Sequence, residues 1–219
     1  MTPITLYHCA SARSFRVLWT LQEIGLPCEL RMLPFPPRVL KPEYLDINPL
    51  GTIPLLLDGA SRLTESAAIC QYLAVKHSPR MLNVEPDEPG FADYLNFLHF
   101  GEATLTFPQT LVLRYSRLES KERRQPQVVE DYGKWFLARL RTLEPRLQNA
   151  DFLAAGRFTA ADVSVGYALM LADILGMTLQ FTPAVAAYWR RLQQREGFQR
   201  ALAAQDAAAR EQGVPASPV

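Results

Sequence analysis

A proline inside an apolar run constrains the fold of this chain more than any other feature. The run Ile53-Pro54-Leu55-Leu56-Leu57 has the composition of a buried strand, but Pro54 lacks the backbone N–H that a central sheet position needs. We therefore expect the backbone beside Pro54 to turn out of the hydrogen-bonding ladder, and a cis peptide bond is one way to do so. The sequence thus predicts a strand whose first residues offer main-chain groups to a ligand.

The residues that follow predict an anion site at the start of a helix. Asp58-Gly59 predicts a turn, so the apolar run and Arg62-Leu63 should form a hairpin. Thr64-Glu65-Ser66 then begins a helix, whose first N–H groups and dipole favour a carboxylate. A bound main chain at one end and a bound carboxylate at the other predict a small peptide as the ligand.

Residues 1–78 alternate between strand and helix patterns. Strands are expected at Ile4 to Tyr7, at Cys28 to Leu33 and in the hairpin, and helices at Ser14 to Ile24, Pro42 to Ile47 and Glu65 to Lys76. The order βαβ followed by ββα is that of a thioredoxin-like fold. The first βαβ unit favours a parallel pair of strands.

The pattern becomes entirely helical in the second part of the chain. Residues 79–89 are rich in proline and are predicted to be a linker, and residues 90–219 are predicted to be an all-helical domain. Helices are expected at Phe91 to Glu119 with breaks at Gly101 and Pro108, and at Val128 to Leu147, Thr159 to Leu175, Pro183 to Arg195 and Phe198 to Arg210. The predicted fold class is α/β plus all-α, a thioredoxin-like domain followed by a helical bundle.

Composition restricts the partners and the compartment. A net charge of +1 over 219 residues gives no support for binding to nucleic acid or to an anionic membrane. No apolar run approaches the roughly 18 residues of a membrane span, and the first residues do not resemble a signal peptide. The cysteines Cys9, Cys28 and Cys70 are widely spaced and show no metal-ligand pattern. We therefore expect a cytoplasmic protein without a metal.

Three motifs together resemble the soluble glutathione S-transferases over nearly the whole chain. They are the stretch from Asn48 to Pro54, the pair Glu65-Ser66, and GRFTAAD at residues 156–162. In the last motif Thr159 predicts an N-cap and Asp162 the N3 partner of a capping box. In this family, that capping box begins the buried core helix of the C-terminal domain.

The resemblance implies that glutathione is the co-substrate. The Ile53 backbone beside a cis Pro54 would pair with its cysteinyl part, and Glu65 with Ser66 would hold its γ-glutamyl group. The alternative for Pro54 is a plain proline at the start of a strand. The alternative for Glu65 is an ordinary charge at a helix N-terminus, and that for Ser66 is a simple helix cap.

The partner of the glycyl carboxylate of glutathione differs between this chain and many relatives. Many relatives have lysine where this chain has Thr52. Lys41 or Arg38, both in the preceding loop, could replace that cation, and a solvated surface role is the alternative for each. Thr52 and Lys41 are retained as candidate binding residues.

Sulfur chemistry requires the glutathione thiolate, and a free thiol has a pKa near ~8.5. Aligned on Ser14-Phe15-Arg16-Val17, the chain resembles the zeta-class pattern Ser-Ser-Cys-Ser-x-Arg-Val, which places the catalytic serine at Ser11 and a second hydroxyl at Ser14. The omega-class pattern Cys-Pro-x-Ala instead selects Cys9 and implies mixed-disulfide chemistry. The pattern Asn-Ser-Arg-Ser-x-Arg-Val-Leu-Trp of bacterial and fungal transferases puts Ala12 at the usual serine.

Ser11 is the preferred candidate for the sulfur-activating group, with Cys9 and Ser14 as alternatives. Ser11 could also be an ordinary helix N-cap, and Cys9 a small buried hydrophobe. The resemblance is therefore to a bacterial-type enzyme with zeta- or theta-like serine features near its N-terminus.

Aromatic and apolar residues at the start of the helical region predict a pocket for a hydrophobic electrophile. The candidates are Phe100, Thr104, Phe107 and Tyr115, although residues at such helical spacing can equally form the bundle core. The resemblance implies a homodimer and a conjugating transferase. A thiol-disulfide oxidoreductase or lyase using Cys9, and a non-catalytic glutathione-binding module, are the alternatives.

Overall fold

The computed structural model describes residues 4–78 and 81–215, which form two compact units. The first unit contains the described residues up to Ser78 and also the segment that starts at Gln194. The second unit contains the described residues from 81 to Gln193. The predicted helical region is thus divided between the two units. Residues 79–80 of the predicted linker and residues 216–219 of the predicted helical domain lie outside the described residues.

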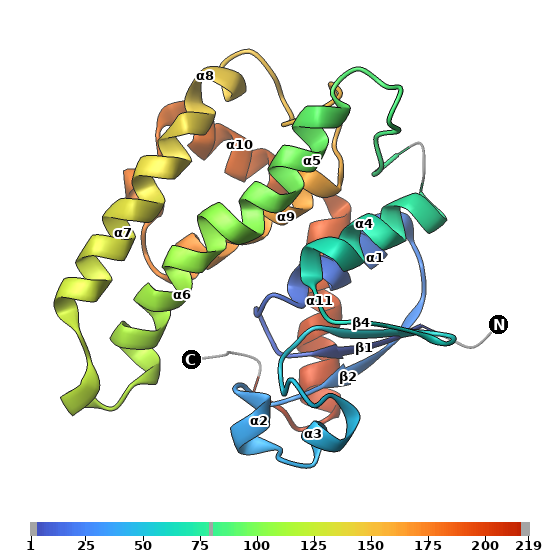
Figure 1. The fold of residues 1–219 in the computed structure, drawn as a ribbon, viewed down its shortest axis with the longest axis vertical. Coiled ribbons are helices and arrows are strands. Elements are labelled where there is room, and N and C mark those ends of the chain that lie inside the picture. Colours follow the sequence, from blue (N-terminus) through green and yellow to red (C-terminus); the bar gives the residue numbers. More distant parts are fainter. Residues whose placement is uncertain (1–3, 79–80, 216–219) are drawn as a thin grey trace. The chain divides into compact units, whose positions relative to one another are not determined.

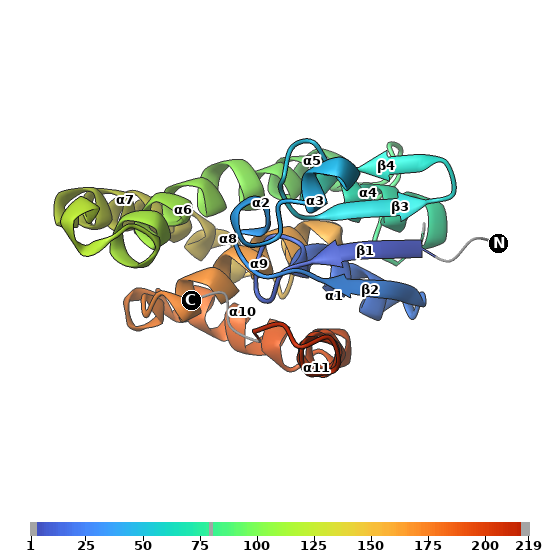
Figure 2. The same cartoon turned by 90° about the horizontal axis from the view of Figure 1, so that it is seen from below.

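A four-stranded mixed sheet forms the centre of the first unit (Figure 2). Its strands are β1 (Ile4–His8), β2 (Cys28–Met32), β3 (Leu55–Asp58) and β4 (Ser61–Leu63), in the order β2-β1-β3-β4. Strand β1 pairs in parallel with β2 and antiparallel with β3, and β3 pairs antiparallel with β4. This topology confirms the thioredoxin-like order that the sequence predicts.

The burial of each strand follows its place in the sheet. Every residue of the inner strand β1 is buried, as expected for a strand covered on both faces. The edge strand β2 shows alternating burial over most of its length, because one of its faces is open to solvent. The predicted parallel pair is therefore formed by one inner strand and one edge strand.

The helices of the first unit pack on this sheet and on one another (Figure 1). They are α1 (Phe15–Ile24), α2 (Pro37–Leu40), α3 (Tyr44–Ile47), α4 (Ser66–His77) and α11 (Glu196–Glu211). Helix α1 contacts both α4 and α11, and Phe198 of α11 packs edge-on against Trp19, with ring centroids 4.9 Å apart. Helix α2 was not expected, since its proline-rich sequence predicts a loop; proline is well tolerated in a first helical turn.

The second unit is helical. Its α-helices are α5 (Phe91–His99), α6 (Phe107–Leu113), α7 (Pro126–Leu140), α8 (Glu144–Leu147), α9 (Ala160–Ile174) and α10 (Pro183–Gln193). Its 3₁₀-helical turns are η3 (Lys121–Arg123), η4 (Arg141–Leu143) and η5 (Thr178–Gln180). These helices confirm the all-helical pattern of this part of the chain.

Two π-helical segments, η1 (Phe100–Thr106) and η2 (Arg114–Leu118), lie where the sequence predicts a broken helix. Pro108 has no N–H to donate to the preceding turn, which favours a wider turn ahead of it. Gly101 allows close helix packing, because a Cβ there would lie 2.5 Å from the backbone carbon of Ser164 in α9. The helix therefore continues through both predicted breaks with altered geometry.

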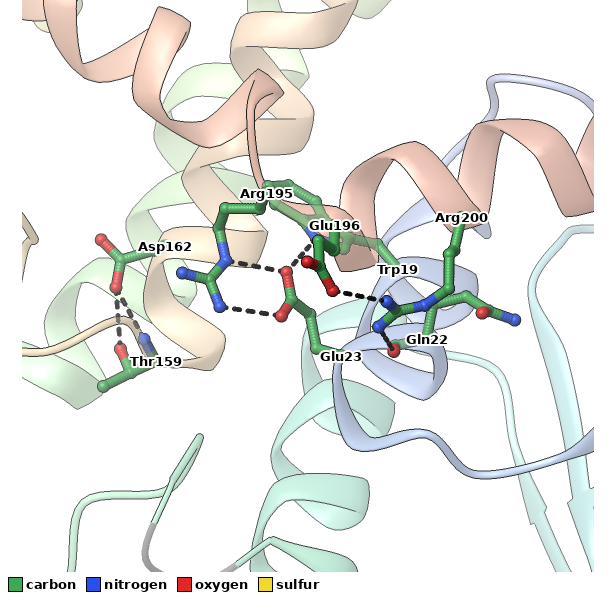
Figure 3. A network of polar contacts seen from close by, with 8 residues as sticks. All are labelled: Trp19, Gln22, Glu23, Thr159, Asp162, Arg195, Glu196 and Arg200. Carbon is green, nitrogen blue, oxygen red and sulfur yellow. Dashed lines mark hydrogen bonds and ion pairs between the residues drawn. The ribbon is translucent and has the colours of Figure 1, made fainter.

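The predicted capping box at the start of α9 is confirmed (Figure 3). The Thr159 N–H donates to Asp162 Oδ2 over 2.8 Å. The other carboxylate oxygen, Oδ1, accepts from the Leu153 N–H at 3.0 Å and from the Tyr188 hydroxyl at 2.8 Å. Because Asp162 is fully buried, these donors replace the hydration that it loses on folding.

Candidate active site

Strand register brings the predicted binding motifs to one end of the sheet. Tyr7 of β1 pairs with Leu55 of β3, so the chain beyond β1 runs beside the chain ahead of β3. Leu56 of β3 pairs with Leu63 of β4, so the chain that leaves β4 toward α4 runs beside the chain ahead of β3, where Pro54 lies. The segment that starts at Cys9, the Pro54 turn and the start of α4 therefore share this end of the sheet.

The Ile53–Pro54 peptide bond is cis, as expected. The preceding carbonyl, that of Thr52, accepts hydrogen bonds from the Tyr44 hydroxyl at 2.9 Å and from Asn48 Nδ2 at 2.8 Å. Within the described residues, the main-chain N–H and C=O of Ile53 have no hydrogen-bond partner. Tyr44 and Asn48 thus hold the turn through the Thr52 carbonyl, and the N–H and C=O of Ile53 remain able to form hydrogen bonds with a ligand.

Tyr44 and Asn48 support this turn, and sequence reasoning assigned neither of them a role. Both are buried, at 1% and 3% exposure. Asn48 also closes the preceding turn, at residues 48–51, since its carbonyl accepts from the Gly51 N–H at 2.8 Å. The signal that could have found Asn48 is its place at the start of the motif, three residues ahead of a glycine with φ of +60°.

Helix α4 begins at the predicted anion site. Glu65 is its N-cap and is exposed, whereas Ser66 is buried and accepts a 3.2 Å hydrogen bond from Arg16 Nη1. Arg16 is fully buried on α1. A buried guanidinium beside a helix N-terminus gives this site a positive potential suited to a carboxylate. Sequence reasoning missed Arg16 because an arginine in an amphipathic helix ordinarily faces solvent.

The candidates for the glycyl carboxylate lie in two different places. Lys41 is exposed and lines a cavity of about 530 Å³ together with Tyr7, Glu29, Arg31 and Tyr44. The lining of that cavity does not include Thr52, Pro54 or Ser66. Arg38 lies beside the motif loop instead, because a Cβ on Gly51 would come within 2.7 Å of Arg38 Cβ.

Cys9 and Ser14 are the first and last residues of the loop that connects β1 with α1, and both are buried. The Cys9 N–H donates to Ser14 Oγ at 3.3 Å, and the Ser14 hydroxyl lies 3.4 Å from the Cys9 carbonyl oxygen. The thiol of Cys9 lies 3.6 Å from the Pro34 carbonyl oxygen. Burial raises the pKa of Cys9 to about 12, so its sulfur is a protonated thiol at neutral pH.

Ser11 is partly exposed and has an unusual backbone conformation. Its φ is +55°, in the left-handed region that non-glycine residues seldom adopt. Its N–H donates to the side-chain oxygen of Gln205 at 2.7 Å. Of the three candidates for sulfur activation, Ser11 is the one with a partly exposed side chain.

The candidate electrophile residues occupy the altered helix of the second unit. Phe100 and Thr104 lie on η1, Phe107 begins α6, and Tyr115 lies on η2. Phe107 is 51% exposed, whereas the other three are intermediate in burial. Phe100 also packs edge-on against Phe97, which is buried, with ring centroids 5.9 Å apart. Their assignment to an electrophile pocket stays a prediction.

Cys9, Cys28 and Cys70 all have free thiols. Among residues 4–78 and 81–215, no group of three or more His, Cys, Asp or Glu side chains could hold a metal ion. In the same ranges, none of the helices has the length and hydropathy required to cross a bilayer.

Sequence comparison identifies relatives of this chain. The family model of the glutathione S-transferase N-terminal domain matches residues 10–76. Glutathione S-transferase 1 of Zea mays is 30% identical over 211 residues, covering 93% of this chain and 97% of that protein. Glutathione S-transferase 3 of Zea mays is 29% identical over 216 residues, covering 93% and 95%.

Solved structures share the same fold. Glutathione transferase URE2P6 from Phanerochaete chrysosporium, solved in complex with oxidized glutathione, has a TM-score of 0.81 and 27% identity, covering 94% of this chain and 97% of that one. Poplar glutathione transferase F1 has a TM-score of 0.82 and 24% identity, covering 95% and 100%. These are fungal and plant proteins, so the bacterial subtype stays a prediction. The chain belongs to the glutathione S-transferase family of enzymes, in which glutathione is the co-substrate.

Proposed function

We propose that this enzyme adds the sulfur of glutathione to hydrophobic electrophiles and that Ser11 activates the thiol. The exposure of Ser11, in contrast to the buried Cys9 and Ser14, carries the assignment. A hydroxyl that donates to sulfur stabilises the thiolate relative to the thiol, which lowers the thiol pKa. The proposal therefore includes activation of the glutathione thiol by a serine hydroxyl. It also includes the zeta- or theta-like serine features that the sequence suggests.

The glutathione backbone would bind at the shared end of the sheet. The unpaired main chain of Ile53 supports an antiparallel pairing with the cysteinyl part of the peptide. The Ser66 hydroxyl and the start of α4, with Arg16 behind them, support binding of the γ-glutamyl carboxylate. Glu65 is exposed and would take the γ-glutamyl ammonium group.

The glycyl carboxylate would be held from the loop before the motif. Arg38 is the better candidate than Lys41, because Arg38 lies against Gly51, next to Thr52. Phe100, Thr104, Phe107 and Tyr115 would contact the electrophile. A homodimer in the cytoplasm, as the family resemblance implies, completes the proposal.

The experiment combines glutathione binding with conjugation. The wild-type enzyme is titrated with glutathione by calorimetry, and conjugation to 1-chloro-2,4-dinitrobenzene is followed by absorbance. We expect binding in the millimolar range or tighter, and measurable turnover. An enzyme that binds no glutathione at millimolar concentrations would contradict the function itself.

A pair of serine variants tests the assignment of Ser11. Ser11→Ala should lower kcat about a hundredfold with little change in glutathione affinity, because only thiolate stabilisation is lost. Ser61→Ala, in β4 of the same unit, is the control and should keep wild-type kcat. Unchanged kcat in Ser11→Ala would overturn the assignment and leave the transferase function standing.

A further inference from the structure

The loop that carries Ser11 is attached to the last helix of the chain by one buried side chain. Gln205 of α11 is 2% exposed. Its Oε1 accepts the Ser11 N–H at 2.7 Å, and its Nε2 lies 3.5 Å from the Ser11 hydroxyl oxygen. Both residues belong to the first unit, although 194 positions separate them in the sequence.

The same amide oxygen also binds the end of β1. His8 Nε2 lies 3.0 Å from Gln205 Oε1, and His8 is fully buried. Because an amide oxygen can only accept, His8 must carry its proton on Nε2. Burial lowers the pKa of His8 to about 4, so the ring is neutral at physiological pH and this tautomer is the stable donor. Gln205 thus receives two fixed donors from β1 and from the loop.

The conformation of Ser11 needs such a restraint. A residue other than glycine at φ of +55° persists only where the surrounding structure holds it. The Ala12 N–H also donates to the Cys9 carbonyl at 3.2 Å, which closes the turn around Ser11. Without Gln205, the Ser11 N–H would lose a buried acceptor and the loop could relax to an ordinary backbone conformation.

We propose that Gln205 is a positioning residue, which holds Ser11 in its left-handed conformation and so directs the Ser11 hydroxyl toward the glutathione sulfur. The inference rests on the proposed function of Ser11. Gln205 need not touch glutathione, because it acts through the Ser11 backbone. Its removal should impair sulfur activation more than glutathione binding, since Ile53 and Ser66 do not contact it.

The chain offers a matched control on the same helix. Gln212, at the C-cap of α11, receives a 2.8 Å hydrogen bond from the Met32 N–H and donates over 2.8 Å to the Leu30 carbonyl. It too joins α11 to a strand through a side-chain amide, but it contacts the edge strand β2. Gln212→Leu therefore shows how much the activity depends on the attachment of α11 to the sheet, without any change at the Ser11 loop.

The test compares Gln205→Leu, Gln212→Leu and wild type by three measurements: steady-state kinetics, the pKa of the bound thiol and amide hydrogen exchange. In Gln205→Leu we expect kcat to fall about tenfold or more, while KM for glutathione stays within about threefold of the wild-type value. The apparent pKa of the bound thiol, read from thiolate absorbance against pH, should rise by about one unit. Hydrogen exchange of the Ser11 amide should accelerate about tenfold or more. Gln212→Leu should leave kcat, the thiol pKa and the Ser11 exchange rate unchanged, even if both variants lose thermal stability.

Gln205→Glu provides the rescue, because its carboxylate still accepts the Ser11 N–H and should restore slow amide exchange. An unchanged thiol pKa together with unchanged Ser11 exchange in Gln205→Leu would overturn the inference, as would equal changes in Gln212→Leu. These results remain separate from a failure of the proposed function. If the proposed function were wrong, the wild-type protein would not bind glutathione. Hydrogen exchange would still test the contact between Gln205 and Ser11, because that measurement needs no glutathione.

Discussion

Arg195 binds Glu23 through two parallel hydrogen bonds, both 2.8 Å long (Figure 3). Glu23 Oε1 also accepts the indole N–H of Trp19 at 2.8 Å. The Glu23 side chain is 7% exposed and that of Arg195 is 30% exposed. This ion pair joins the C-terminal turn of α1 to the residue that precedes α11.

Glu23→Gln should lower the free energy of unfolding by about 2 kcal/mol, because the amide removes one acceptor and the charge that Arg195 binds. Chemical denaturation followed by circular dichroism measures the change. Glu130→Gln, which removes an exposed i,i+4 pair with Lys134 on α7, should leave stability within experimental error. Equal effects of the two substitutions would refute a special role for the Glu23 pair.

Gly101→Ala should destabilise the protein by about 1–3 kcal/mol. The added methyl group would meet the backbone of Ser164 at 2.5 Å, so η1 and α9 would have to separate. Gly133→Ala on α7 is a matched control with open space around the new Cβ, and it should stabilise by about 0.5–1 kcal/mol. Thermal denaturation of both variants distinguishes crowding from helix propensity, and a stabilised Gly101→Ala would contradict the close packing.

Stability should depend on pH through His8. Its pKa in the folded protein is about 4, below the ordinary value near 6.5, so the unfolded chain binds more protons between these values. The folded state is therefore destabilised as pH falls from 6.5 to 4, by about 3 kcal/mol from this residue alone.

Urea denaturation at several pH values between 4 and 6.5 measures the free energy of unfolding of the wild type and of two histidine variants. His8→Gln, which keeps a donor toward Gln205, should remove that part of the pH dependence. His99→Gln, at an exposed histidine of α5, should retain it. If wild type and His8→Gln lost the same stability on acidification, His8 would not be the responsible group.

Cys9→Ala should keep at least half of the wild-type conjugating activity. The sulfur of Cys9 is buried and its pKa is raised to about 12, which leaves almost no thiolate at neutral pH. Alkylation of native protein with iodoacetamide, read by mass spectrometry, should modify Cys9 more slowly than Cys28, which is partly exposed. Loss of activity in Cys9→Ala with rapid alkylation of Cys9 would support the thiol-disulfide alternative instead.

The sequence predicted those parts of the fold that depend on short-range patterns. The βαβ-ββα order, the cis bond at Pro54 and the capping box of Thr159 and Asp162 all follow from neighbouring residues.

Contacts that join distant parts of the chain could not be predicted in this way. Gln205 looks like any polar residue of an amphipathic helix, and its role is visible only because α11 returns to the first unit. Arg16 is similar, since only the packing of α4 on α1 buries its guanidinium against Ser66. The left-handed conformation of Ser11 has no local signal either, because glycine or asparagine would ordinarily mark it.

The return of α11 to the first unit also constrains how this protein can be made. His8 and Gln205 meet although 197 positions separate them. A ribosome synthesising the chain from its N-terminus releases the β-sheet long before it releases α11. The loop that carries Ser11 thus reaches its final contacts only after Gln205 has been translated, and a product that terminates before α11 would contain the four strands of the described sheet but lack the contact with Gln205.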